Sequence, residues 1–327
     1  MKICVFGAGS IGGMTAALLS YAGYEVSVIA RGEQLKAIKK NGLSLESEEL
    51  NIDITEKIYS TNDPKILGKQ DLLIIALKSH SAALNANIMR PLLGNTTVVI
   101  PAVNGVPWWY FYGLKGPYEN HKIKSVDPQN QQWNILTPKR VIGCVVYPAA
   151  NVIKPGVIKH IEGTRMLLGE PNGKNTERCD TISQIFRKSK FKSPIRKHIR
   201  EDIWLKLWGN LSFNPISLLT RATLEDIAND EGCKNIVKLM MQEGESVANA
   251  LGIQFPINID KRIDGTRKVG QHKTSTLQDL ELKRPVEIDA LTLAVSELGK
   301  IVGIKTPNID YIYNLAKMCA KNSGCYP

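Results

Sequence analysis

Several features that mark specialised classes of protein are missing from this 327-residue sequence. No apolar run reaches the roughly 20 residues that a membrane-spanning helix needs, so we expect no membrane partner. The six cysteines are scattered without a Cys-x-x-Cys pair or zinc-ligand spacing, and we therefore expect no metal site. Cys4 and Cys144 lie in apolar, strand-like runs, which favours buried thiols in a reducing compartment, the cytoplasm.

Aromatic residues are also few, at 6% of the chain, and acidic residues are outnumbered by basic ones, 31 to 42. The resulting net charge of +11 is a reason to consider nucleic-acid binding. However, the lysines are spread along the chain and the aromatic residues do not alternate with them. We interpret the excess charge as a solvated basic surface that suits a small anionic ligand, and we expect no nucleic-acid partner.

The length of the chain favours two domains, and the pattern changes near residue 199. Residues 1–199 alternate strand-like and helical segments, whereas residues 200–327 are mainly helical, with helices expected at 201–214, 223–251, 275–283 and 286–302. We find no internal repeat. The apolar and small residues after Lys2 superficially suggest a signal peptide, but glycine spacing explains them better, and we expect no targeting segment.

The sequence GAGSIGG follows a buried strand expected at Lys2–Phe6 and precedes a helix expected at Ser10–Tyr21 and a strand at 24–30. This is the setting that a dinucleotide-binding fingerprint requires. The first glycine permits the tight turn, the second lets the pyrophosphate approach the backbone, and the third lets helix and strand pack closely. The residues predicted to bind the cofactor here are Gly7, Ala8, Gly9, Ser10, Ile11 and Gly12.

Arg31 stands at the end of the second strand, where NAD-binding proteins place an acidic residue for the ribose 2′-hydroxyl. A cation at this place pairs with a 2′-phosphate, which predicts NADPH as the cofactor; the alternative is an ordinary surface arginine. Glu33 lies beyond the strand end and carries less weight. Lys78 and Asn104 follow two later strand-like runs, and carboxyl ends of strands are where such sheets bind ligands, although either residue alone is equally consistent with a loop surface.

A polar stripe runs along the helix expected at 201–214, where Lys206, Asn210 and Asn214 fall within an arc of about 80°. The rest of this helix is apolar nearly all round, which is typical of a buried helix. Buried polar groups need partners, so the stripe predicts contact with a ligand or, alternatively, internal pairing with another helix. Pro215 is expected to end or kink the helix just after Asn214.

A second group of candidates lies further along the chain. Glu287 is expected about two residues into a helix that starts near Pro285, where a carboxylate also suits the helix dipole without any further role. Asp289 is an equal candidate for the same acid on position alone. Ser275 is a candidate binding residue that is equally consistent with a helix N-cap.

Together these motifs resemble the ketopantoate reductase (2-dehydropantoate 2-reductase) family over nearly the whole chain. The resemblance rests on GAGSIGG, LKS at 77–79, NG at 104–105, TSTLQD at 274–279, EID at 287–289 and, most specifically, LKLWGNLSFNP at 205–215. It implies a Rossmann-type α/β domain that binds NADPH, followed by an all-α domain, like the C-terminal domain of 6-phosphogluconate dehydrogenase, that closes over the substrate. It also implies reduction of ketopantoate to pantoate in pantothenate biosynthesis.

The resemblance further implies roles for single residues. Lys206 is expected to donate the proton to the keto oxygen, and Asn210 and Asn214 to hold the substrate. Ser275 is expected to bind the substrate carboxylate, and Glu287 to lie by the cofactor ribose and the substrate hydroxyl. Lys78 and Asn104 are expected to contact cofactor or substrate.

Two departures from the family pattern concern the substrate. The segment after Asn104-Gly105, residues 106–133, is longer than in compact members and carries an aromatic run at 108–112, which either reshapes the substrate pocket or packs the insertion onto its domain. A substrate asparagine found in members some ten residues past the Asn-Pro has no match here. The alternatives are a reductase of another small 2-keto acid and a non-catalytic NADPH-binding regulator. The sequence leaves the oligomeric state open, with a homodimer as one candidate.

Overall fold

The computed structural model describes residues 1–327, and contacts between residues divide them into two compact units. Unit 1 comprises residues 1–103, 109–122 and 130–199, and unit 2 comprises residues 104–108, 123–129 and 200–327. Two short stretches of the segment after Asn104 therefore belong to the helical unit, which the sequence division at residue 199 did not foresee.

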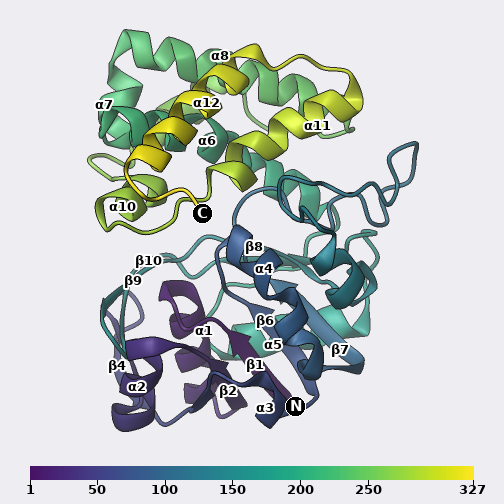
Figure 1. Ribbon diagram of the computed structural model, residues 1–327, viewed down its shortest axis with the longest axis vertical. Helices are drawn as coiled ribbons and strands as arrows, with labels where there is room; N and C mark the ends of the chain where they lie inside the picture. The colour runs from purple at the N-terminus through teal and green to yellow at the C-terminus, as the bar shows by residue number, and fades with distance from the viewer. The chain divides into compact units, whose positions relative to one another are not determined.

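Unit 1 is built on a five-stranded parallel sheet with the strand order β5-β2-β1-β6-β7 (Figure 1). Counted along the chain, this is the order 3-2-1-4-5 of a doubly wound nucleotide-binding sheet, with the first strand in the middle and strands of both halves present. The central strands β1 and β6 are near-continuous apolar runs, as strands covered on both faces are. Their bounds are β1 Lys2–Phe6, β2 Glu25–Ile29, β5 Tyr59–Thr61, β6 Gln70–Ile75 and β7 Leu93–Pro101.

Unit 1 also contains five helices and three short helical turns. They are α1 Ser10–Tyr21, α2 Gly32–Asn41, α3 Pro64–Leu67, α4 Ser79–Met89, α5 Glu177–Lys188 and the turns η1 Arg90–Leu92, η2 Gln132–Leu136 and η3 Pro138–Arg140. Helix α1 has the bounds that the sequence predicted, and it is buried along almost its whole length.

A second sheet, which sequence reasoning missed as a unit, packs against α1. Its four strands run in the order β4-β3-β10-β9 and combine two antiparallel pairs with one parallel pairing between β3 and β10. Their bounds are β3 Leu43–Ser47, β4 Ile52–Glu56, β9 Ala149–Lys154 and β10 Val157–Glu162. Ile158 of β10 would lie 2.7 Å from a Cβ placed on Gly13, so this glycine admits the sheet against α1.

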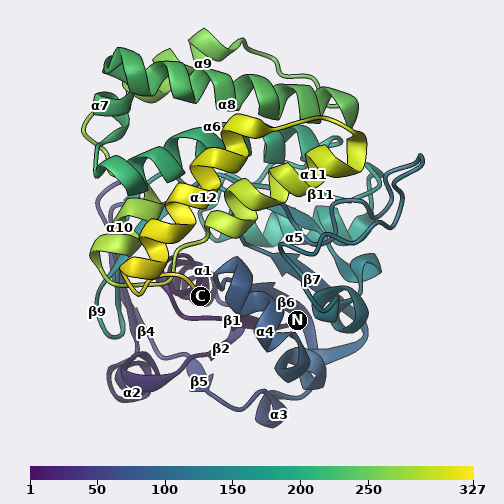
Figure 2. The same ribbon diagram turned by 45° about the horizontal axis from the view of Figure 1, so that its top comes forward.

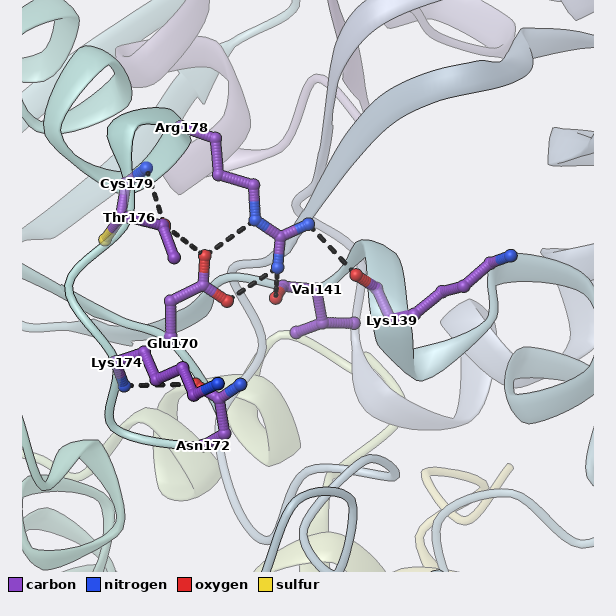
Figure 3. Close-up of polar contacts among 8 residues, drawn as sticks. All are labelled: Lys139, Val141, Glu170, Asn172, Lys174, Thr176, Arg178 and Cys179. Carbon is purple, nitrogen blue, oxygen red and sulfur yellow. Dashed lines mark hydrogen bonds and ion pairs between the residues drawn. The ribbon is translucent and has the colours of Figure 1, made fainter.

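An ion pair between a buried carboxylate and a half-buried guanidinium joins the short two-stranded sheet of β8 Gly143–Val146 and β11 Met166–Gly169 to the start of α5 (Figure 3). Glu170, at the end of β11, accepts hydrogen bonds from Nε and Nη2 of Arg178, both at 2.6 Å, and from the hydroxyl of Thr176. Arg178 also donates to the carbonyl oxygens of Lys139 and Val141. The carboxylate of Glu170 is only 3% exposed, so these partners compensate the loss of its hydration.

Unit 2 is a bundle of helices around α6 and α8, seen in Figure 2 together with α9, α11 and α12. Helix α8 contacts α7, α9, α11 and α12. The bounds are α6 Ile199–Thr220, α7 Leu224–Asn229, α8 Glu231–Ala250, α9 Ile259–Arg267, α10 Ser275–Glu281, α11 Ala294–Val302, α12 Pro307–Asn322 and the π-helical turn η4 Asp289–Leu293.

Helix α6 is buried on nearly every side, as its apolar composition predicted. Trp204, Trp208 and Leu211 are completely buried, and the indole of Trp208 donates to the carbonyl of Met241 in α8. Leu211 would lie 2.7 Å from a Cβ on Gly244, so the glycine lets α6 and α8 approach closely.

Several expected boundaries were wrong. Of the two alternatives for Pro215, an end or a kink of the helix, the end is wrong, because α6 continues to Thr220. The helix expected at 223–251 is two helices, α7 and α8, with a break at Asp230. The Asp230 carboxylate accepts a hydrogen bond from the N–H of Cys233 and so caps α8. Helices α9 and α12 were not foreseen.

All six cysteines are free, and Cys4 and Cys144 are buried as predicted. Burial raises the pKa of the Cys4 thiol to about 12. No helix combines the length and the apolar character that crossing a membrane would need.

Candidate active site

The glycine turn of unit 1 lies between β1 and α1, and its glycines differ in the space around them. Gly7 has φ +108°, and a Cβ there would lie 2.8 Å from the carbonyl oxygen of Ala76. A Cβ on Gly12 would lie 1.9 Å from the carbonyl oxygen of Gly7. Packing within the protein therefore requires glycine at these two positions.

Gly9 differs, because a Cβ at this position would meet no atom within 4 Å. Gly9 occupies the N-cap position of α1, and no side chain forms a capping hydrogen bond there. The first turn of a helix directs backbone N–H groups outwards and carries partial positive charge, so it binds phosphate. Open space at this glycine fits the approach of a dinucleotide pyrophosphate.

Sequence reasoning missed Gln34, which anchors the turn from α2. Its Nε2 donates to the carbonyl of Ala8 at 2.8 Å, and its Oε1 accepts from the N–H of Gly156 at 2.9 Å. One amide thus ties the glycine turn to the loop between β9 and β10. No local pattern marks Gln34, because both partners are distant in sequence.

The two predicted cations of unit 1 stand at the N-cap positions of helices that follow strands. Arg31 is exposed, two residues beyond the end of β2, and opens α2. Lys78 is half-buried, three residues beyond the end of β6, and opens α4. Both strands flank β1, so both residues lie at the edge of the sheet to which the glycine turn belongs.

Within unit 2, the central contact is a hydrogen bond of 2.7 Å from Nζ of Lys206 to Oδ1 of Asn104. Both side chains are half-buried, and Lys206 projects from an otherwise buried helix. The turn after Asn104 is held by Val106, whose N–H donates to the carbonyl of Ala290 at 2.9 Å. Gly105 has φ +90°, and a Cβ there would lie 2.4 Å from the same carbonyl oxygen. Only glycine allows this turn to pack so closely.

The two asparagines of the stripe have different surroundings. Asn210 is half-buried, whereas Asn214 is 4% exposed and its Nδ2 donates to the hydroxyl of Thr276 at 3.1 Å. Asn214 is thus paired internally, which was the alternative interpretation for the stripe. Its bond reaches the first turn of α10, where Ser275 is the exposed first residue. Ser275 is not the N-cap, because Thr274 occupies that position and accepts from the N–H of Leu277.

Glu287 and Asp289, which sequence position did not separate, differ in their contacts. The phenol hydroxyls of Tyr313 and Tyr326 both donate to the Asp289 carboxylate. Glu287 is half-buried and precedes the helical turn, so the expected start of a helix near Pro285 was wrong.

The aromatic run after Asn104 is part of the protein interior. Trp108, Trp109, Tyr110 and Phe111 are each at most 4% exposed, and Phe111 packs edge-on against Tyr110 and His121. The ring of Trp109 would lie 2.7 Å from a Cβ on Gly143 of β8. These four aromatic residues therefore pack the insertion into the protein interior and do not form an open aromatic surface.

Comparisons with known proteins agree with this organisation. The model of the ketopantoate reductase PanE/ApbA family matches residues 3–173, and that of its C-terminal domain matches residues 198–320. A 2-dehydropantoate 2-reductase of Mesorhizobium japonicum is 47% identical over 327 residues, all of both chains.

Solved structures share the fold over nearly the full length. A chain from Ralstonia solanacearum MolK2 is 36% identical, with 99% of each chain covered and a TM-score of 0.94. A ketopantoate reductase from Staphylococcus aureus, described as dimeric, is 20% identical, with 99% of this chain and 100% of the other covered and a TM-score of 0.76.

The different surroundings of the glycines generate a prediction. Gly9→Ala adds a methyl group to open space, so we expect a folded protein with a normal melting temperature. Because that methyl group occupies the place expected for the pyrophosphate, the Kd for the dinucleotide should rise by at least about ten-fold. Calorimetric titration and thermal melting measure the two quantities.

Gly12→Ala is the matched comparison, because its methyl group collides with the backbone at Gly7. This variant should lose stability before any ligand is added. Unchanged dinucleotide affinity in Gly9→Ala would contradict the assignment of the turn.

Proposed function

This chain belongs to the ketopantoate reductase family, whose members reduce ketopantoate to pantoate with a nicotinamide dinucleotide, and we propose that it does so with NADPH and with Lys206 as the proton donor. Membership confirms the predicted family, the two-domain fold class and the oxidoreductase activity. The observation that carries the proposed role of Lys206 is its hydrogen bond with Asn104. An amine held in one orientation at a half-buried position is what a proton donor requires.

The reaction adds a hydride to the keto carbon and a proton to the keto oxygen. When bound, the reduced nicotinamide supplies the hydride. Lys206 holds the proton at Nζ and gives it to the oxygen as negative charge develops there. Oδ1 of Asn104 accepts a hydrogen bond from one of the three N–H groups of the ammonium group. This contact fixes the direction of the other two N–H groups. The product is a 2-hydroxy acid.

The remaining residues are assigned to binding. Asn210, one turn beyond Lys206 on the same stripe, holds the substrate, and Ser275 at the start of α10 binds its carboxylate. We assign Asn214 to positioning, because its bond to Thr276 fixes the first turn of α10 beside Ser275. Glu287 binds the substrate hydroxyl and the cofactor ribose.

The glycine turn holds the pyrophosphate, with Gly9 leaving room and the first turn of α1 supplying N–H donors. Lys78 and Asn104 contact the cofactor or the substrate. Arg31 pairs with the 2′-phosphate, and its exposure at the end of β2 supports this assignment.

Replacing the proton donor tests the reaction directly. Lys206→Met keeps the aliphatic stem but removes the ammonium group, so kcat with ketopantoate should fall by about 100-fold or more while NADPH still binds. The rate is followed by loss of the absorbance of the reduced nicotinamide. Lys300→Met, at an exposed position on α11, is the control and should match the wild type.

A panel of branched 2-keto acids separates the alternatives in the same assay. Turnover of another 2-keto acid in place of ketopantoate would identify a related reductase. NADPH binding without any turnover would indicate a regulator, and both results would contradict the proposal.

The cofactor preference has its own test. Arg31→Ala removes the partner of the 2′-phosphate, so the KM for NADPH should rise by about ten-fold or more, since hydrogen bonds to charged groups contribute roughly 1.5–3 kcal/mol. The KM for NADH should not change, because NADH lacks that phosphate. Lys39→Ala, exposed at the other end of α2, should leave both values unchanged. Equal effects on the two cofactors would contradict the assignment.

We also propose that the chain forms a homodimer, as the S. aureus protein is described to do. Leu315 and Met318, 57% and 58% exposed, lie one turn apart on α12 and offer an apolar surface to a second copy. Light scattering should give about twice the 36.2 kDa mass of one chain, and Leu315→Asp should shift the mass towards the monomer. The mass of a single chain for the wild type would contradict the proposal.

A further inference from the structure

The Asp289 carboxylate accepts hydrogen bonds from two phenol hydroxyls of the C-terminal segment, which lie 24 and 37 positions further along the chain. Tyr313 of α12 donates to Oδ1 at 2.9 Å, and Tyr326 donates to Oδ2 at 2.9 Å and to Oδ1 at 3.1 Å. Burial raises the pKa of both phenols, and the Asp289 charge raises it further, so both hydroxyls remain protonated donors. Hydrogen bonds that involve an ionised acceptor are among the stronger ones in proteins.

The segment that carries Tyr326 also holds the backbone before Glu287. The carbonyl of Cys325 accepts from the N–H of Val286 at 2.9 Å, and Cys325 and Val286 are both buried. On the other side of Glu287, Ile288 is completely buried in the same apolar cluster as Tyr313. Glu287 therefore projects from a backbone fixed on both sides, by Cys325 before it and by the two tyrosines after it.

This fixed backbone extends to the partner of Lys206. Asp289 begins the π-helical turn η4, and the next residue, Ala290, accepts the N–H of Val106 and packs against Gly105. Asn104, which holds the ammonium group of Lys206, directly precedes that glycine. A shift of η4 would thus move both Glu287 and the acceptor of the Lys206 hydrogen bond. Such π-helical turns are rare and occur frequently at functional sites.

We propose that Tyr326 and Tyr313, acting through Asp289, are positioning residues for this reductase, because they set the place of Glu287 and of the Asn104–Lys206 pair. The proposal rests on the proposed function of those residues. It also assigns Asp289, which sequence position left as an equal candidate for the acid, to a role behind the site rather than in contact with substrate.

The test removes the hydroxyl of Tyr326, which makes two of the three hydrogen bonds to Asp289. Tyr326→Phe keeps the ring and its packing but loses both hydrogen bonds to Asp289, so kcat with ketopantoate should fall about ten- to 100-fold, as small misplacements of reacting groups do. The Kd for NADPH should stay close to the wild-type value, and the melting temperature should fall by no more than about a few degrees, the cost of one lost donor. Tyr59→Phe removes a hydroxyl from an exposed tyrosine and is the control, with wild-type kinetics expected.

A double-variant cycle tests the route through Asp289. Asp289→Asn keeps the shape and an acceptor but removes the charge, and it should lower kcat to a similar degree. Adding Tyr326→Phe to Asp289→Asn should then cause little further loss, because residues that act through one contact are not additive. Additive losses would contradict the route through Asp289.

Two further outcomes would overturn the proposal. One is a wild-type kcat in Tyr326→Phe, and the other is a parallel loss of melting temperature, NADPH affinity and kcat, which marks a purely structural role. Failure of the proposed function looks different: the wild type would not reduce ketopantoate, or Lys206→Met would retain the wild-type rate.

Discussion

The hydrogen bond between Lys206 and Asn104 constrains much of unit 2, because its two residues are 102 positions apart. Asn104 lies three residues beyond the end of β7, at the point where the chain passes from unit 1 to unit 2. Gly105 makes the turn that follows with a positive φ and without a Cβ, and Val106 fastens it to Ala290. The position of one acceptor oxygen thus depends on a glycine, a backbone hydrogen bond and the turn that carries Asp289.

The sequence separation between contacting residues also explains why some parts of the fold were predicted better than others. The turn from Lys2 to Tyr21 was predicted to the residue, because strand, glycines and helix are local and each glycine has a steric reason. The sheet of β3, β4, β9 and β10 was not, since its parallel pairing joins segments more than 100 residues apart. Local patterns contain no information on such pairings.

The residues of the candidate site also differ in whether the sequence could identify them. Lys206, Asn210 and Asn214 stood out because three polar residues at helical spacing interrupt an apolar helix. Gln34, Tyr313 and Tyr326 did not stand out, because an isolated amide or phenol has no periodic pattern. Their roles become visible only through partners, such as Asp289, which lies 37 residues from Tyr326.

A buried helix with a polar stripe has an energetic problem, since unpaired polar groups in an apolar interior cost about 1–3 kcal/mol each. Helix α6 solves it with partners from outside its own sequence: Asn104 for Lys206 and Thr276 for Asn214. Both partners sit in segments that the proposed reaction also uses, the turn at Asn104 and the first turn of α10 beside Ser275. Under the proposed function, the bonds that satisfy the stripe in the interior are therefore also the bonds that orient it for the reaction, and a substitution that removed the polar groups would remove that orientation as well.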